Sequence, residues 1–455
     1  MVARMDLGHA QIKGMTQMGF FGFLLLAILL LAVGVVVYGL LVPLKVHVRT
    51  RMDGAPGTGG LTGLDDRPFV GLALSGGGAR AAVFGAAGMH ELARLGLLQQ
   101  VTHVSSVSGG GFPASYWATN DMPGDTGGAL DEYFQAMLDT VSKDYFNAIH
   151  RNQLRHPSRL MSPSRRLTSL QEGLHQEGFL SRKGSDATIG DLPCARAFFF
   201  NAVSYDTGRR FVFSNQSLPH PDDTDASRLP GAIRALSFSD DRASRPAPSS
   251  FPISLAVATS AAFPPYLGPL TIEVERPDAA AKEFWRLGDG GVLENPGVET
   301  LREAFYGTDK TQGRLYSFDA GLRLQPSFSK TDISIFSRDL MQFIDVILEY
   351  AGGHRSTLYS VLDEKHGVSM RTFAFNYLDI EKLLAAGALG PDDQRLWGSW
   401  DAWPGVGATT RAQAASPALR LRQVPTGFAI SADDRILIEQ AARTLVKHSI
   451  DDLTQ

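Results

Sequence analysis

The sequence predicts an α/β protein built around a mostly parallel sheet. Short apolar runs, tight glycine turns and helical segments follow one another twice between residues 69 and 118. A parallel sheet is covered on both faces, so its strands read as unbroken apolar runs rather than as alternating ones. The run Phe69–Leu74 has this character and stops at a glycine triplet. Two successive strand–turn–helix units are typical of a parallel sheet covered by helices.

The first two units can be followed along the chain. After the strand Phe69–Leu74, a helix is expected over Arg80–Leu95, with alanine and glycine keeping one of its sides small. Gly96 is a suitable stop for this helix, because glycine readily adopts the left-handed conformation at a helix end. The second unit repeats the order, with a strand expected over Val101–Val107 and a helix over Gly109–Ala118.

Later segments carry further signals. Two β-rich runs, Ala197–Ser204 and Arg209–Ser214, flank a short polar turn and predict a hairpin. A long amphipathic helix is expected over Ile333–Ala351, and a further strand over Met370–Tyr377. Gly390–Pro417 mixes tryptophan, glycine, proline and alanine without a period, so we expect a long surface loop there.

The end of the chain is predicted to be a helix over Ala432–Ser449, with Ser431 as its N-cap. No second linker rich in glycine and proline divides residues 65–455. We therefore expect residues 67–455 to form one folded domain.

The N-terminal segment is unusually apolar. No charged side chain occurs between Lys13 and Lys45. As a helix, Gly19–Leu44 would be about 39 Å long at about 1.5 Å per residue, enough to cross a hydrocarbon core about 30 Å thick. A cleaved signal peptide has a shorter apolar region and a small-residue cleavage site, whereas this stretch ends in Val42-Pro43-Leu44-Lys45. The sequence therefore predicts a single transmembrane helix over residues 19–44, after a flank of residues 1–18.

A linker is expected between this anchor and the domain, over residues 45–66, because Asp53–Gly63 is too rich in glycine to pack. Basic residues flank the apolar helix almost equally: Arg4 and Lys13 precede it, and Lys45, Arg49 and Arg51 follow it. The positive-inside rule then slightly favours a cytoplasmic position for the large domain.

Composition excludes several classes of protein. With 455 residues, 44% hydrophobic and 20% charged, the chain has a globular composition and enough length for a large core. A formal net charge of −4 argues against nucleic-acid binding, which usually needs a basic surface. Cys194 is the single cysteine, so an intrachain disulfide and a cysteine-based metal cluster are excluded. No cofactor and no metal are expected.

A glycine loop follows the first strand. Gly76, Gly77 and Gly78 leave a strand and open a helix, so their backbone N–H groups can point at one negatively charged atom. Such donors suit the oxyanion of an acyl-transfer reaction. A dinucleotide loop would need an acidic residue after the second strand, and a P-loop would need Gly-Lys-Ser/Thr; both are missing. A nucleotide-binding loop, whose glycine pattern Gly76-x-Gly78-x-x-Ala81 matches, and a purely structural turn remain the alternatives.

A serine follows the second strand. Ser108 has Gly109 at +1 and Gly110 at +2, as a nucleophile elbow requires where strand and helix approach closely. Ser106 stands at −2, where glycine is usual, and it is itself a poorer nucleophile candidate because Val104 and Ser108 flank it. The alternative for Ser108 is a helix N-cap.

A carboxylate stands at a third sharp turn. Asp289 follows an expected strand end and precedes Gly290-Gly291. An Asp-Gly pair also favours a plain hairpin turn, which is the alternative. An aspartate with a pKa of about 3.9 is a poor base near neutrality, but burial against a serine hydroxyl raises its proton affinity.

In chain order, these three segments resemble the motifs of the patatin-like phospholipase family: a Gly-Gly-Gly-x-Arg-Gly loop, a Gly-x-Ser-x-Gly elbow and an Asp-Gly-Gly/Ala motif. The similarity runs from about residue 69 to residue 296 and includes Ala258–Pro264 and Asn295-Pro296, with a weaker echo at Val424-Pro425-Thr426. Ala81 and Ser106 replace glycines of the family pattern, each by another small residue.

The resemblance implies a three-layer α/β/α fold with a mostly parallel central sheet. It implies a lipid acyl hydrolase of the phospholipase A or lysophospholipase type, in which Ser108 is the nucleophile and Asp289 the base of a dyad without histidine. Calcium is not expected, and the implied partners are a lipid substrate and the bilayer. The resemblance assigns the oxyanion hole to Gly76, Gly77 and Gly78, with Arg80, Gly109, Gly110 and Gly290 as supporting residues.

Two other functions remain open. An ordinary hydrolase triad would need a histidine after the acid, and His354, His366 and His448 qualify by chain order. A catalytically silent, membrane-anchored scaffold could instead bind anionic headgroups through the basic stretch His150–Arg166, for which a solvated loop is the alternative.

Overall fold

The fold was analysed in a computed structural model of the chain. The structure describes residues 22–35, 37–38, 63–124, 127–160, 163–176, 187–216, 218, 251–264, 266–274, 283–321, 361, 363–364, 367–374 and 377–449. Most of the expected linker and the helix expected over Ile333–Ala351 lie outside these residues, as do His354 and His366.

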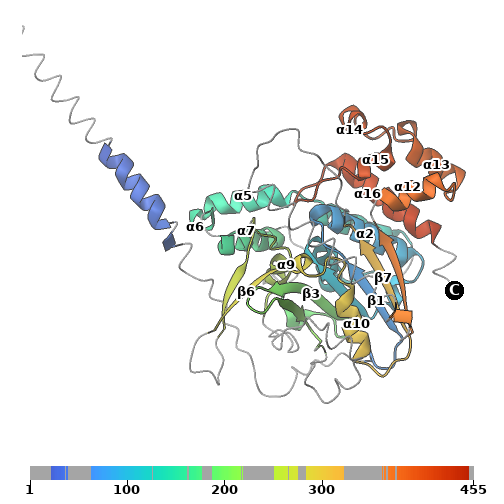
Figure 1. Cartoon of the computed structure of the whole chain (residues 1–455), viewed down its shortest axis with the longest axis horizontal. Coiled ribbons are helices and arrows are strands. Elements are labelled where there is room, and N and C mark those ends of the chain that lie inside the picture. Colours follow the sequence, from blue (N-terminus) through green and yellow to red (C-terminus); the bar gives the residue numbers. More distant parts are fainter. Residues whose placement is uncertain are drawn as a thin grey trace, which may run out of the picture.

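A mixed sheet with the strand order β5-β6-β3-β2-β1-β7-β8 forms the centre of the molecule, and β4 pairs with β3 off this path (Figure 1). The strands are β1 (Phe69–Leu74), β2 (His103–Val107), β3 (Ala197–Ser204), β4 (Arg209–Ser214), β5 (Leu270–Val274), β6 (Glu283–Asp289), β7 (Gly313–Asp319) and β8 (Val368–Ala374). The neighbours from β3 to β8 along this order run parallel, whereas β4 and β6 run antiparallel to β3. The mostly parallel sheet is therefore confirmed.

Helices extend from the sheet or cover it. They are α2 (Gly78–Arg94), α3 (Gly111–Thr119), α4 (Gly128–Val141), α5 (Tyr145–Arg155), α6 (Pro157–Leu160), α7 (Pro163–Gln176), α9 (Ile253–Ser260), α10 (Val298–Tyr306), α12 (Tyr377–Ala385), α13 (Pro391–Gly398), α14 (Ala408–Gln413), α15 (Pro417–Leu421) and α16 (Ala432–His448). Within the described residues, the basic stretch expected as a possible loop over His150–Arg166 lies mostly in helices α5, α6 and α7.

Both faces of the sheet are covered. Leu72 and Leu74 of β1 belong to the core formed with α2 and α16. Phe69 and Ala73 of the same strand belong to a second core with Leu301 of α10. Figure 1 shows α10 on the opposite side of β1 and β7 from α2 and α16. This two-sided burial explains why β1 is an uninterrupted apolar run.

The expected boundaries agree closely where glycine turns or caps mark them. The strand Phe69–Leu74 and the hairpin of β3 and β4 match the expected ranges, and α16 begins after Ser431, whose hydroxyl accepts the N–H of Asp434. The helix expected over Gly109–Ala118 is α3, which begins later, at Gly111, because a 3₁₀ turn over Ser108–Gly110 precedes it. The strand expected over Met370–Tyr377 is β8, which begins at Val368 and ends at Ala374.

The long surface loop expected over Gly390–Pro417 is wrong. This segment contains α13 and α14 and leads into α15, and Trp397 of α13 is fully buried, with its Nε1–H donating to the hydroxyl of Thr444. These helices are each eight residues or shorter, so no helical period shows in their sequence. Packing against α16 stabilises this segment instead of intrinsic helix propensity.

The N-terminal region is described only in part. Residues 22–35 are helical, as are residues 37–38. None of the helices in the described part of the chain is both long and apolar enough to cross a bilayer. The remaining residues of the expected 19–44 anchor lie outside the described ranges.

Candidate active site

Ser108 sits in a strained turn at the end of β2. Its φ of 50° is the only positive value of a non-glycine residue among the described residues. A side chain on Gly109 would meet the carbonyl oxygen of Gly78 at 2.0 Å, and one on Gly110 would meet that of Leu74 at 2.4 Å. The two glycines therefore let the serine turn pack against the end of β1 and the start of α2. Strain of this kind persists only where the surrounding structure enforces it, and it clusters at functional sites.

Asp289 lies at the end of β6 and is 2% exposed. Its Oδ1 accepts the N–H of Gly291 at 2.7 Å, and its carboxylate accepts a hydrogen bond from the Ser108 hydroxyl. Burial raises the pKa of Asp289 to about 7, although these two hydrogen bonds act in the opposite direction. Ser108 and Asp289 therefore lie close enough for the serine hydroxyl to affect the pKa of the carboxyl group. The chain after Asp289 forms a 3₁₀ turn over Gly290–Val292 instead of a hairpin.

Strand register explains how residues so far apart in sequence meet. Along β3, Asn201 pairs with Val107 at the end of β2, and Ala202 pairs with Asp289 at the end of β6. Because β4 pairs with β3 over both of these positions, β2 and β6 share the other edge of β3 and abut there end to end. Ser108 is the next residue after β2, so it emerges beside Asp289.

Two side chains that sequence reasoning did not assign hold this junction together. The Ser108 N–H donates to Oγ of Ser260 at 2.9 Å, and the Ser260 hydroxyl donates to the carbonyl oxygen of Asn201 at 2.5 Å. The Asn201 side chain donates to the Ser106 carbonyl oxygen at 2.9 Å and accepts from the Thr300 hydroxyl at 2.6 Å. Ser260 lies in the Ala258–Pro264 segment noted for family resemblance, whereas Asn201 gave no signal within its strand.

The glycine loop passes directly over the serine. A side chain on Gly76 would lie 3.3 Å from Cβ of Ser108. Gly77 and Gly78 have φ values of 138° and 61°, which favour glycine. Within the described part of the chain, the N–H groups of Gly77 and Gly78 bind no acceptor, whereas the next N–H, that of Ala79, donates to the carbonyl oxygen of Gly427 at 2.6 Å. Two backbone donors are thus left for a ligand beside the serine.

Arg80 ties this loop to two distant segments. Its Nε–H donates to the carbonyl oxygen of Ala320 at 3.0 Å, and its Nη1 donates to that of Val424 at 2.9 Å. Burial lowers the pKa of Arg80 to about 10, an effect that Asp319 partly offsets. The guanidinium therefore stays charged at neutral pH and can hold the loop in place through its hydrogen bonds to these two carbonyl groups.

The segment 424–427 completes the site from the far end of the chain. A side chain on Gly78 would meet the carbonyl oxygen of Gly427 at 2.1 Å, so the two glycines pack backbone against backbone. The only sequence sign of this contact was the weak resemblance at Val424-Pro425-Thr426. A side chain on Gly290 would similarly meet the carbonyl oxygen of Asn201 at 2.4 Å, which explains the glycine after Asp289.

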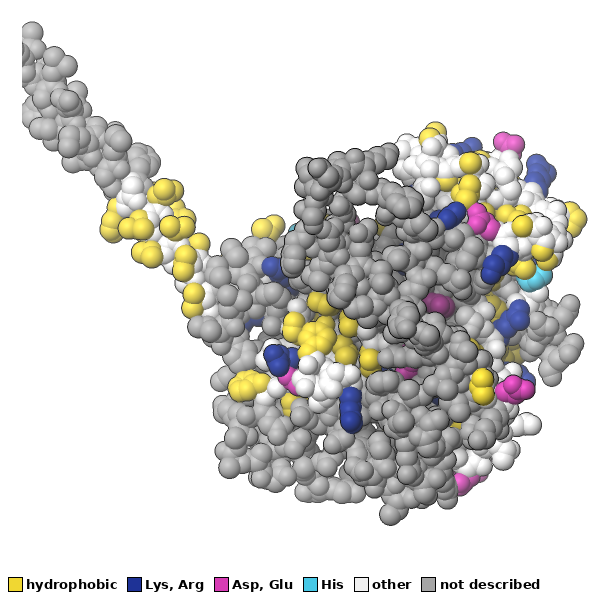
Figure 2. Space-filling model, viewed as in Figure 1, with side chains coloured by type: hydrophobic (Ala, Val, Ile, Leu, Met, Phe, Trp, Pro, Cys, Tyr) yellow, Lys and Arg dark blue, Asp and Glu magenta, His cyan; other side chains and the backbone are white. Residues whose placement is uncertain are grey.

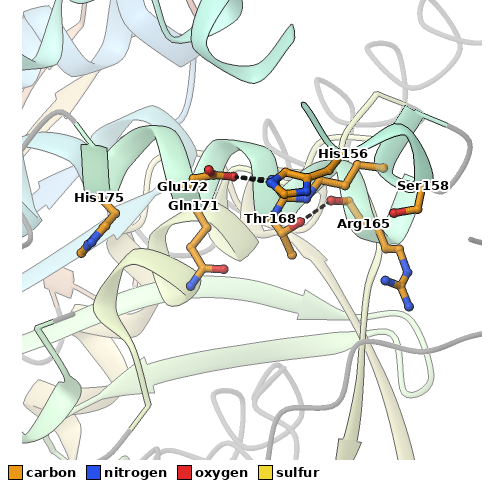
Figure 3. Close-up of a pocket in the computed structure, with 8 residues that line it drawn as sticks. His156, Ser158, Arg165, Thr168, Gln171, Glu172 and His175 are labelled. Carbon is orange, nitrogen blue, oxygen red and sulfur yellow. Dashed lines mark hydrogen bonds and ion pairs between the residues drawn. The ribbon is translucent and has the colours of Figure 1, made fainter. Parts of the chain in front are cut away.

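Other polar groups lie elsewhere. His448 is exposed at the C-terminal end of α16 and, in the part of the chain that the structure describes, forms no hydrogen bond or ion pair with Ser108 or Asp289. Among the described residues, no cluster of histidine, cysteine and carboxylate side chains is arranged to hold a metal ion. A separate hollow of about 460 Å³ is lined by side chains of α7 and of the segment around α6, shown in Figure 3. None of its lining residues belongs to the serine–aspartate site.

Comparison with known proteins identifies the family. The sequence model of the patatin-like phospholipases matches residues 72–302, about half of the chain, and spans all three motifs. The chain belongs to the patatin-like phospholipase family. The family resemblance found in the motifs is therefore confirmed.

Solved structures similar to this patatin-like protein include the human GIVD cytosolic phospholipase A2, with 14% identity and a TM-score of 0.40 over 86% of this chain and 60% of that one. VipD from Legionella pneumophila has 12% identity and a TM-score of 0.33 over 85% of this chain and 67% of that one. The chain thus spans about 60% of the length of the human enzyme. No curated protein matches the sequence.

Proposed function

We propose that this protein is a serine lipid acyl hydrolase, of the phospholipase A or lysophospholipase type, that uses a Ser108–Asp289 dyad. Family membership supports hydrolysis of a lipid substrate. The observation that carries the mechanism is the hydrogen bond from the Ser108 hydroxyl to a buried carboxylate whose pKa is raised to about 7.

The reaction begins with proton transfer. The Asp289 carboxylate takes the hydroxyl proton of Ser108 while Oγ attacks the ester carbonyl carbon of the lipid. The carbonyl oxygen becomes an oxyanion and accepts hydrogen bonds from the N–H groups of Gly77 and Gly78, with Gly76 shaping the loop. As the C–O bond breaks, the protonated Asp289 gives its proton to the departing alcohol, and an acyl-serine remains.

Water completes the cycle. Asp289 takes a proton from a water molecule, whose oxygen attacks the acyl carbonyl carbon through the same oxyanion geometry. The acyl-serine bond breaks, the proton returns to Oγ of Ser108, and a free fatty acid leaves. The chain, the lipid and water supply every group in this sequence of steps.

The raised pKa suits Asp289 to the role of a base. An unperturbed aspartate is a weak base at neutral pH, whereas a pKa near the working pH combines an ionised population with substantial proton affinity. Burial provides this shift without histidine.

We also propose that residues 19–44 anchor the protein in a membrane, with residues 45–66 as a linker and residues 67–455 as the catalytic domain on the cytoplasmic side. The exposed side chains of the described N-terminal helix support an apolar environment, since Phe23, Leu25 and Leu31 are 73%, 71% and 70% exposed (Figure 2). Alkaline extraction of membranes tests the anchor, and protease protection of sealed vesicles tests the side.

A fluorophosphonate probe and product analysis test the activity. The full chain should react with the probe, and Ser108→Ala should abolish the labelling. Mass spectrometry of a lipid extract should show free fatty acid released by the wild type and almost none by Asp289→Asn. Equal release by Asp289→Asn would refute the assigned base, and absence of labelling in a folded wild-type chain would favour a lipid-binding scaffold. Loss of activity in a His→Ala variant at 354, 366 or 448 would favour a triad.

A further inference from the structure

Helix α5 presents a mixed apolar and basic face to the outside. Its inner side is buried, whereas its outer side exposes Phe146, Asn147, Arg151, Leu154 and Arg155, here called the α5 face. Leu154 is 71% exposed and Phe146 is 44% exposed. Apolar side chains beside arginines on one helix face are typical of a helix that lies in a membrane interface.

The two arginines of the α5 face are available for a ligand. Within the described part of the chain, Arg151 and Arg155 form no ion pair and no side-chain hydrogen bond. Some other exposed arginines do have partners, as Arg443 has in Glu91 and Arg286 in Asp206. What marks the α5 face is that two such arginines lie on one helix together with the exposed side chains of Phe146 and Leu154.

The α5 face borders the oxyanion loop. The N–H of Phe146 donates to the carbonyl oxygen of Phe428 at 3.2 Å, and the preceding residue, Gly427, accepts the N–H of Ala79. The ring of Tyr266 lies 6.2 Å from that of Phe146 and 6.4 Å from that of Phe428. An aromatic cluster thus connects the exposed end of α5 with the segment that closes the active site.

Helix α7 extends the basic surface toward the N-terminal helix. The Arg165 guanidinium carbon lies 5.2 Å from the ring centroid of Tyr38, beyond the apolar residues 22–35. Figure 1 shows this N-terminal helix approaching the molecule beside α6, on the side that carries α5 and α7. Arg165 also lines the polar hollow of Figure 3, together with Arg159, His156 and His175. Glu172 balances Arg159 there.

We propose that the α5 face docks on an anionic lipid surface and brings the mouth of the active site to the bilayer. Arg151 and Arg155 contact phosphate groups, and Phe146 and Leu154 enter the headgroup boundary. The proposal rests on the proposed function for its purpose, since a lipid hydrolase must receive its substrate from a bilayer. Charge complementarity and the neighbouring apolar N-terminal helix favour a membrane as the occupant rather than a protein.

The test measures lipid preference without catalysis. The full chain is placed in non-ionic detergent micelles that contain dansyl-labelled phosphatidylglycerol or dansyl-labelled phosphatidylcholine, and energy transfer from tryptophan is recorded. The wild type should prefer the anionic lipid, and salt should weaken this preference. Arg151→Gln with Arg155→Gln should reduce the preference by roughly fivefold for each arginine, which corresponds to about 1 kcal/mol per basic residue near an anionic surface.

A matched control changes two other exposed cations. Lys382 of α12 and Arg395 of α13 are exposed, and both helices lie away from α5–α7 in Figure 1. Lys382→Gln with Arg395→Gln should leave the lipid preference unchanged. A preference that survives the α5 substitutions, or falls equally in the control, would overturn the docking surface.

Hydrolysis separates this proposal from the proposed function. The double variant Arg151→Gln with Arg155→Gln should cleave a short soluble ester at the wild-type rate. On a micellar substrate, it should lose the stimulation by phosphatidylglycerol. Leu154→Ser should lower micellar hydrolysis alone, because its side chain is too exposed to contribute to folding. If the wild type cleaves neither substrate, the proposed function fails, and the energy-transfer result still decides the docking surface.

Discussion

The substitution Asp289→Asn should inactivate the protein and, at neutral pH, stabilise it. Burial raises the pKa of Asp289 from 3.8 to about 7, so the folded protein holds its proton more tightly than the unfolded chain does. The folded state thus binds more protons between these values, and its stability falls as pH rises through this window. At 1.36 kcal/mol for each pKa unit, the full cost above pH 7 is about 4 kcal/mol.

Asparagine removes this cost but keeps the shape. Its amide oxygen can still accept the N–H of Gly291, and its amide NH₂ can donate to Oγ of Ser108. The variant should therefore gain nothing near pH 4 and up to about 4 kcal/mol above pH 7. Urea unfolding of both full chains, followed by tryptophan fluorescence from pH 4.5 to pH 8.5, measures this difference. A difference that stays constant or shrinks as pH rises would refute the reasoning.

A nearby carboxyl group provides the control. Burial, assisted by the negative charge of Glu299, also raises the pKa of Glu294 to about 7. Wild-type kcat/KM should rise with pH through about 7, because only the ionised Asp289 can take the serine proton. Glu294→Gln should keep both the activity and this midpoint. A midpoint that disappears in Glu294→Gln would show that Glu294 titrates near pH 7 in the active enzyme, which would contradict the assignment to Asp289.

Three further predictions concern the elbow and the loop. Ser108→Gly and Ser108→Ala should both be inactive, but glycine should be more stable than alanine by about 1 kcal/mol in urea unfolding, because it relieves the positive φ. Gly78→Ala should lower kcat by about 10²- to 10³-fold through the clash with the Gly427 carbonyl, whereas Gly427→Ala, with open space around its side chain, should keep kcat. Arg80→Lys should lower kcat more than it changes KM, since lysine cannot hold the Ala320 and Val424 carbonyls in the same fork; a change in KM alone would argue against support of the oxyanion loop.

The sequence alone determined the local parts of the site. A buried parallel strand, a glycine triplet and a serine followed by two glycines are patterns of neighbouring residues, so β1, the loop and the elbow were all predicted from them. The glycines carry this information because only they permit the close approaches seen at Gly78 and Gly109. The short helices α13–α15 escaped prediction, because packing against α16 and not their own periodicity stabilises them.

Only the tertiary structure decided how these parts meet. The contact between Ser108 and Asp289 depends on β2 and β6 ending at adjacent positions along one edge of β3, which no local pattern encodes. The carbonyl oxygen of Gly427, which takes the Ala79 N–H, belongs to the backbone and therefore has no residue signature. Long-range register and backbone acceptors are properties of the folded chain, and they bring three separate motifs together at one place.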